Sequence, residues 1–192
     1  MKLWLPLLAV GALALPACSS GDTAETGLFE ALSAHCGNSY EGRVESDDPR
    51  DADWVSQRLV IEFRECSDDT IRIPLHVGED HSRTWVVSRT ENGLRLKHDH
   101  RHEDGSEDVL TQYGGDTEGP VTGLRAEFPA DDFSRDLFER EGIPVSMDNV
   151  WSLTLTEETL TYALDRPDRH FEAVFNLTET VDTPPPPWGA EG

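Results

Sequence analysis

The side chains best suited to chemistry lie in segment 94–102, LRLKHDHRH, where three histidines occupy alternate positions. In a β-strand alternate residues share a face, so His98, His100 and His102 would all point the same way. The two leucines of the segment share that face, which makes it the more apolar side and predicts that it faces the interior. Buried imidazoles need partners there, because an unpaired buried polar group costs about 1–3 kcal/mol.

Two flanking turns predict the neighbours of these histidines. Asn92-Gly93 and Asp104-Gly105 are dipeptides typical of two-residue hairpin turns, which would pair the segment with strands 83–90 and 107–113. The expected partners are Val87 and Thr111 for His98, Trp85 and Val109 for His100, Arg83 and Glu107 for His102, and Tyr113 for Leu96. The opposite face, which includes Thr84 and Asp99, is expected to be solvated.

Three interpretations of the histidine face stay open. The first is a hydrogen-bonded polar network at a barrel mouth, or exposure where the strand leaves the sheet. The second is a pocket for a small molecule, with an anion as one option, formed by Arg83, Trp85, His98, His100, His102, Glu107 and Tyr113. The third is a metal site with His98, His100 and Glu107 as ligands, since a His-x-His strand can place two imidazoles on one ion. Arg83 argues against a cation beside His102, and no cofactor can be named.

Enzyme signatures are mostly absent. The chain contains no Gly-x-Ser-x-Gly, no phosphate-binding glycine loop and no His-Glu-x-x-His. Glu107 and His100 could form a carboxylate–histidine pair, but many proteins offer as much. A non-enzymatic role is therefore favoured, and a metal-dependent hydrolase stays an alternative.

Period-2 alternation of apolar and polar residues predicts the elements that hold this face. The expected strands are 39–45, 58–65, 70–77, 83–90, 94–102, 107–113, 121–128, 151–156, 159–165 and 170–178. Short helices are expected near 27–35 and 131–141, where apolar residues share a helical face and a glycine follows. Many short strands with one apolar face each predict an antiparallel up-and-down β-barrel of about 8–10 strands, because closure removes exposed edges.

Two resemblances accompany this prediction. Segment 37–42, GNSYEG, after a short helix, resembles the start of the first strand in lipocalin-type (calycin-like) barrels, with Tyr40 where that family usually has tryptophan. This resemblance implies a barrel with a ligand-binding interior. Residues 73–115 also look like an uncharacterised family of exported bacterial proteins, a likeness that implies no activity.

The charge of the chain excludes the usual kind of nucleic-acid partner. The 192 residues carry 16 Lys and Arg against 38 Asp and Glu, a formal charge of −22. A polyanion would be repelled, and no basic stretch is long enough to offset this. After the N-terminus no apolar run is long enough to span a membrane.

The N-terminus predicts that the protein is exported from the cytoplasm. Lys2 is followed by the apolar run 3–15, which has the length of a signal-peptide core. Leu15-Pro16-Ala17-Cys18 resembles the lipobox of bacterial lipoproteins, with Pro16 a departure from the commonest pattern. This resemblance implies cleavage before Cys18, acylation of Cys18, and, from Ser19, an outer-membrane lipoprotein facing the periplasm. The alternative is an ordinary secreted or periplasmic protein with an incidental Cys18.

The remaining cysteines fit an oxidising compartment. Cys36 precedes the first expected strand and Cys66 ends the second, so an antiparallel hairpin would bring them close enough for a disulfide. Two free thiols or a metal pair are the alternatives.

The chain therefore divides into a signal peptide (1–17), a lipidated tether (18–26), a barrel domain (27–178) and a disordered proline-rich tail (179–192). We expect a cell-envelope protein held to the membrane by its acyl anchor, with a small molecule bound inside the barrel. An envelope scaffold or interaction module without a ligand is the alternative. The ligand, partner proteins and oligomeric state are not specified by the sequence.

Overall fold

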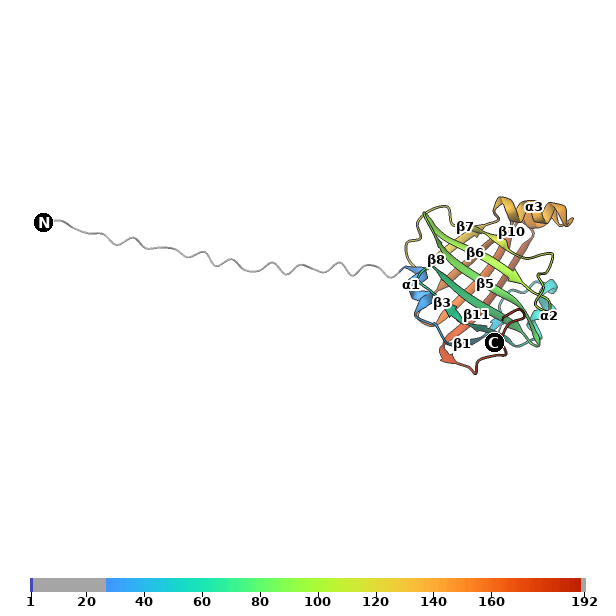
Figure 1. Ribbon diagram of the computed structural model, residues 1–192, viewed down its shortest axis with the longest axis horizontal. Helices are drawn as coiled ribbons and strands as arrows, with labels where there is room; N and C mark the ends of the chain where they lie inside the picture. Colours follow the sequence, from blue (N-terminus) through green and yellow to red (C-terminus); the bar gives the residue numbers. More distant parts are fainter. Residues whose placement is uncertain (2–26, 191–192) are drawn as a thin grey trace.

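The computed structural model describes Met1 and residues 27–190, and β-strands dominate this part of the chain (Figure 1). The strands are β1 (Ser39–Val44), β2 (Leu59–Glu62), β3 (Glu65–Cys66), β4 (Thr70–Val77), β5 (Asp80–Thr90), β6 (Gly93–His100), β7 (Tyr113–Asp116), β8 (Arg125–Pro129), β9 (Val150–Leu155), β10 (Thr159–Arg166) and β11 (Arg169–Thr180). The expected signal peptide, Cys18 and the expected tether fall on residues 2–26, outside the described part of the chain.

The strands form one antiparallel sheet that curls into a nearly closed barrel. Their order is β7-β6-β5-β4-β2-β1-β11-β10-β9-β8, with β3 paired to β4 off this path. Apart from the short β3 and the junction between β7 and β8, strands that follow one another in the sequence pair with each other, and the first strand pairs with the last. The expected antiparallel up-and-down β-barrel is confirmed.

The seam between β7 and β8 completes the barrel without a regular ladder. Gly115 lets the two backbones approach, because a Cβ there would collide with the carbonyl oxygen of Pro129. The Asp131 N–H donates to the Gly114 oxygen at 3.0 Å. The Ser134 hydroxyl bridges both polar backbone groups of Gly114, at 2.7 and 2.8 Å. A short helix thus replaces the missing strand pairing.

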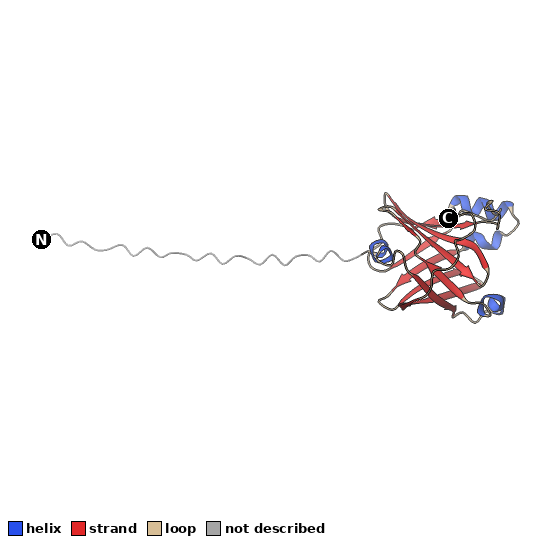
Figure 2. Ribbon diagram, turned by 60° about the horizontal axis from the view of Figure 1, so that its bottom comes forward, coloured by secondary structure: helices blue, strands red, loops and turns tan. Residues whose placement is uncertain are grey.

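Helices lie at both ends of the barrel (Figure 2). α1 (Leu28–Ser33) lies at one end, and Leu28, Phe29 and Leu32 from it are buried in the core. α3 (Asp132–Arg140) lies toward the other end, and its first turn is capped by Asp131. Both helices were expected. Three short elements were not: η1 (Pro49–Asp51), α2 (Ala52–Val55) and η2 (Pro144–Asp148).

A disulfide joins Cys36 and Cys66, as expected, with 6.3 Å between their Cα atoms. It follows α1 and fixes the start of β1 against β3. A cross-link that closes a 30-residue loop adds about 2–4 kcal/mol to stability.

The C-terminal segment differs from the expected disordered tail. β11 continues to Thr180, and residues 181–190 then run along the outside of β4, β5 and β6. The Trp188 N–H donates to the His81 oxygen at 3.0 Å. Pro187 of this segment is buried, and residues 187–190 cover the outer face that was expected to be solvated. Thr84 and Asp99 on that face are each only 5 % exposed.

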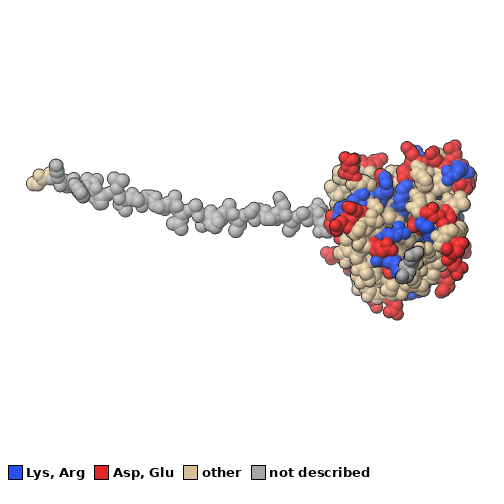
Figure 3. All heavy atoms as spheres, viewed as in Figure 1, with Lys and Arg blue, Asp and Glu red and all other residues tan. Residues whose placement is uncertain are grey.

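Asp99 is stabilised under this cover by two arginines, with Arg72 Nη2 and Arg101 Nε each 2.8 Å from its carboxylate. Figure 3 shows basic side chains in the middle of this face and acidic ones around its edge. Over residues 27–190, no helix is both long and apolar enough to cross a membrane.

Candidate functional site

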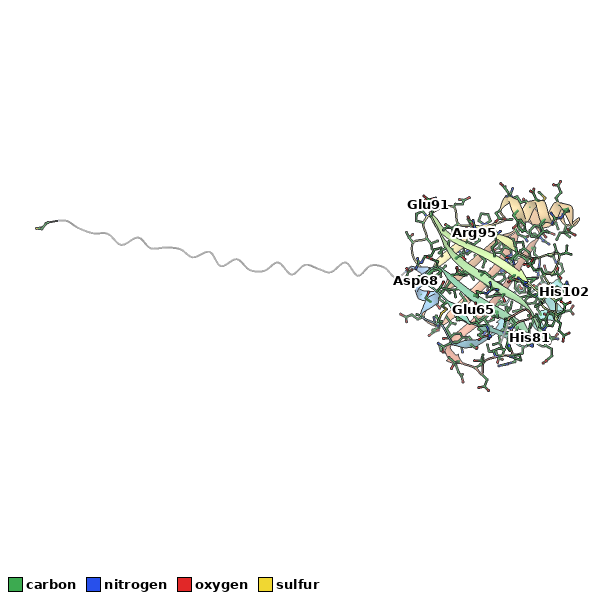
Figure 4. The ribbon with its side chains drawn as sticks, in the orientation of Figure 1. Glu65, Asp68, His81, Glu91, Arg95 and His102 are labelled. Atoms are coloured by element: carbon green, nitrogen blue, oxygen red, sulfur yellow. A yellow bond between two sulfur atoms is a disulfide. The ribbon has the colours of Figure 1, made fainter. Side chains whose placement is uncertain are left out.

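A cavity of about 420 Å³ opens at the end of the barrel away from α1. In Figure 4, His81 and His102 mark this end, whereas Asp68 and Glu91 mark the α1 end. Side chains from the barrel wall, α2, α3 and η2 line the cavity: Trp54, Leu75, Arg83, Trp85, His98, His100, Asp108, Leu110, Tyr113, Phe138, Ile143, Ser146, Asn149, Trp151, Tyr162, Leu164, Arg169 and Phe171. Five of the seven residues expected to bind a ligand are among them.

The pairing of β5 with β6 brings these residues together, in a register two residues from the expected one. Trp85 lies opposite His98 and Arg83 opposite His100, because the turn is formed by Glu91 and Asn92. Gly93 belongs to the strand instead, where a Cβ would collide with Gly119 of a crossing loop. A shift of two residues leaves every side chain on its expected face.

His98 is the most deeply enclosed of the imidazoles, with an exposed fraction of 3 %. Its Nδ1 lies 3.1 Å from the backbone oxygen of Tyr113, and its Nε2 lies 2.9 Å from the Tyr162 hydroxyl. A carbonyl oxygen only accepts, so Nδ1 carries the proton and Nε2 accepts from Tyr162. Burial lowers the pKa of His98 to about 3, which keeps the ring neutral.

His100 lies nearer the mouth and pairs with the other cavity tyrosine. Its Nε2 is 3.2 Å from the Tyr113 hydroxyl. Burial lowers the pKa of His100 to about 4, helped by the charge of Arg83, and burial raises the pKa of Tyr113 to about 12. The pair is therefore uncharged at neutral pH.

Aromatic rings form most of the wall. Trp85 stacks on Tyr162 with 4.4 Å between ring centroids, and His98 stacks on Tyr113 at 4.6 Å. Trp151 packs 5.1 Å from His98 and 5.6 Å from Tyr113. These flat, rigid surfaces suit a planar apolar group.

Two arginines reach the cavity with different surroundings. Arg169 is held by Asp51, by Asp48 at 3.3 Å and by the backbone oxygen of His170 at 2.9 Å. Arg83 binds Asp80 through Nη1 alone, at 2.5 Å, and lies 5.0 Å above the ring of Trp54. Arg169 fastens the 46–57 loop to the barrel, whereas Arg83 keeps other N–H groups free of hydrogen bonds to residues 27–190.

His102 and Glu107 were expected in the site and lie outside it. β6 ends at His100, and the chain then turns through a hairpin in which the His102 N–H donates to Ser106. The His102 side chain is 56 % exposed, and Glu107 binds Arg101 at 3.1 Å on the outer face. The expected strand 107–113 is also wrong, because this stretch belongs to the loop that follows β6. β7 begins only at Tyr113, after Gln112 adopts a positive φ of 58°. Val109, which was expected to face His100, is exposed.

The expected metal ligands are not assembled. Glu107 points away from the cavity, and both ring nitrogens of His98 are already engaged. Among the residues that the structure describes, no group of three or more His, Cys, Asp or Glu side chains could hold a metal ion.

The sequence prediction missed several lining residues, and only some of them could have been identified from the sequence pattern. Trp151 and Tyr162 occupy inward positions of correctly expected strands, so alternation could have identified them. Trp54 comes from a four-residue helix inside an acidic loop, where no periodicity exists to place it.

Comparisons of this chain with protein-family models, with curated proteins and with solved structures found no match. The function must therefore be argued from the site.

Proposed function

We propose that this protein binds a small organic molecule in the cavity at the open end of its barrel. The observation that carries the proposal is the cavity itself, about 420 Å³ and walled by Trp85, Tyr113, Trp151 and Tyr162. This volume lies within the range of about 300–1,000 Å³ typical of ligand sites, as does the combination of apolar walls with a few fixed polar groups. A packing defect of this size would be costly, since each lost contact at its lining weakens the core.

The internal hydrogen bonds also favour a binding site. The inner polar groups satisfy one another through the Tyr162–His98 and Tyr113–His100 pairs. An apolar ligand body can therefore enter without leaving a buried donor or acceptor unpaired.

The test is native mass spectrometry of protein purified from its own cells, together with a variant whose cavity is filled. Leu164 lines the cavity beside Trp151, so Leu164→Trp should remove the co-purifying mass. Leu124→Trp is the matched control, because Leu124 is an exposed leucine away from the lining. If Leu164→Trp retains the bound mass, or if the wild type carries no bound mass and also binds none of the aromatic probes described in the next subsection, the proposal fails.

The interaction-module alternative has less support. An apolar patch away from the histidine face would favour it. Three of the large exposed apolar side chains, Val55, Val109 and Val145, are each adjacent in sequence to a residue that lines the cavity. Leu124 and Phe133 are also exposed and are not adjacent to lining residues.

For location, we propose a lipid-anchored protein of the bacterial cell envelope, acylated at Cys18 and facing the periplasm from the outer membrane. The supporting observations are the lipobox-like 15–18 segment and the disulfide, which is typical of oxidising compartments. Labelling with a radioactive fatty acid should modify the wild type and not Cys18→Ser. Equal labelling, or none, would reject the anchor without affecting the binding proposal.

A further inference from the structure

The charged side chains that line the cavity differ in how free they are to bind a ligand. Of the lining residues, Arg83, Arg169 and Asp108 carry a charge at neutral pH, since the two histidines are neutral. Arg169 is neutralised by Asp51, and Asp108 accepts the Leu110 N–H at 2.7 Å within its own loop. Arg83 has a single carboxylate partner, Asp80, which engages Nη1 only, whereas Arg169 contacts both Asp48 and Asp51.

Arg83 also acts on the polar groups of the inner wall. Burial lowers the pKa of His100, and the charge of Arg83 lowers it further, against the carboxylates of Asp108, Asp80 and Asp99. Burial raises the pKa of Tyr113, and there Arg83 opposes the rise whereas Asp108 reinforces it. Arg83 is therefore the positive charge that acts most strongly on both side chains.

The walls limit the shape of the occupant. Trp85 and Tyr162 form one flat stack, and Trp151, which also lines the cavity, packs against His98. Tyr162 donates its hydroxyl hydrogen to His98, so its oxygen faces the cavity only as an acceptor. A second anionic group at this inner end would be repelled, whereas a ring edge or a donor would be accommodated.

We propose that the cavity binds an organic monoanion with a planar aromatic body, whose carboxylate or similar acidic group pairs with the guanidinium of Arg83 while the ring packs among Trp85, Trp151 and Tyr162. This inference rests on the proposed function and names its ligand class. Arginine suits the role because its fork of N–H groups matches a carboxylate.

The experiment uses three probes of the same shape that differ in charge: 2-naphthoate, 2-naphthamide and 2-naphthylmethylammonium. Each is titrated into the full chain at neutral pH, and binding is measured by calorimetry and by tryptophan fluorescence. We expect naphthoate to bind about tenfold more tightly than the amide, the factor that one charge-assisted contact of about 1.4 kcal/mol provides. The ammonium probe should bind most weakly.

Arg83→Gln should reduce the advantage of naphthoate over the amide from about tenfold to less than about threefold. The matched control is Arg125→Gln, because Arg125 is an exposed arginine on β8 that pairs with Glu127 and does not line the cavity. Circular dichroism of both variants confirms that the barrel is retained.

The outcomes separate the two proposals. If the amide or the ammonium probe binds as tightly as naphthoate, or if Arg83→Gln leaves the preference intact, the ligand class is wrong and the binding function stands. If none of the three probes binds and no mass co-purifies with the native protein, the binding function itself fails.

Discussion

The two ends of the barrel are filled in different ways. At the α1 end, Leu28, Phe29 and Leu32 enter between the strands and are at most 3 % exposed. At the other end, Trp85, Tyr162 and their neighbours are equally enclosed by protein, yet they surround a cavity of about 420 Å³. Both ends bury apolar surface, but only one is filled by the chain itself.

The difference teaches how a small barrel can keep an open site. Flexible aliphatic side chains adjust to fill space, whereas stacked rings have few rotamers and hold one another in place. The Tyr162–His98 and Tyr113–His100 hydrogen bonds fix those rings further, so the open end cannot easily collapse.

The largest expected effect comes from truncating a leucine at the closed end. Leu32 is fully buried, so Leu32→Ala should lower the free energy of unfolding by about 2–5 kcal/mol. Leu164→Ala, in the cavity wall, should lower it by only about 1 kcal/mol, because that side chain already borders empty space. Urea unfolding measures both, and equal losses would contradict the contrast between the two ends.

The disulfide near the closed end should have the next effect. Replacing both Cys36 and Cys66 by serine should lower the free energy of unfolding by about 2–4 kcal/mol, because the unfolded chain regains the freedom of a 30-residue loop. The fluorescence of the cavity tryptophans should stay native in the folded variant. A changed spectrum under native conditions would mean that the two ends are coupled.

The free energy of unfolding should depend on pH through His98, at the cavity end of the barrel. Because the pKa of His98 is about 3 in the folded protein and about 6.5 when unfolded, the unfolded state binds more protons as the pH falls. Stability is therefore full above about pH 6.5 and declines as the pH falls toward the folded pKa, by about 2 kcal/mol for this group at about pH 5.

The variant His98→Phe isolates this contribution. Other titrating groups are common to wild type and variant, so only the difference between the two slopes is interpreted. The wild type should lose about 2 kcal/mol more than His98→Phe between about pH 7 and about pH 5. Parallel slopes would show that His98 is not held neutral in the fold.

The smallest expected effect concerns a single hydrogen bond. Tyr162→Phe removes the donor to His98 Nε2 and leaves that buried nitrogen unpaired, which should lower stability by about 1–3 kcal/mol. Tyr40→Phe is a matched control nearer the closed end, where the hydroxyl bonds to the less buried His35 at 2.8 Å and should matter less. Urea unfolding measures both losses. A larger loss of stability for Tyr40→Phe than for Tyr162→Phe would argue against a fixed polar network in the cavity.

Alternation was enough to predict the barrel and the inward face of His98 and His100, because those properties depend on period rather than on register. It could not predict that β6 ends at His100, since the exit of His102 depends on a loop whose path is set by tertiary contacts. Trp54 was equally hidden, because its place depends on the ion pair between Asp51 and Arg169, which are far apart in the sequence. The five cavity residues that were found all come from β5, β6 and β7.

The position of α1 has a consequence for how the molecule would meet its ligand. The proposed acyl anchor, Cys18, precedes α1 in the chain, so such an attachment would hold the barrel at its plugged end. The mouth lies at the opposite end and would then face away from the membrane surface. A ligand would enter from the surrounding fluid rather than from the lipid, which suits a water-soluble molecule.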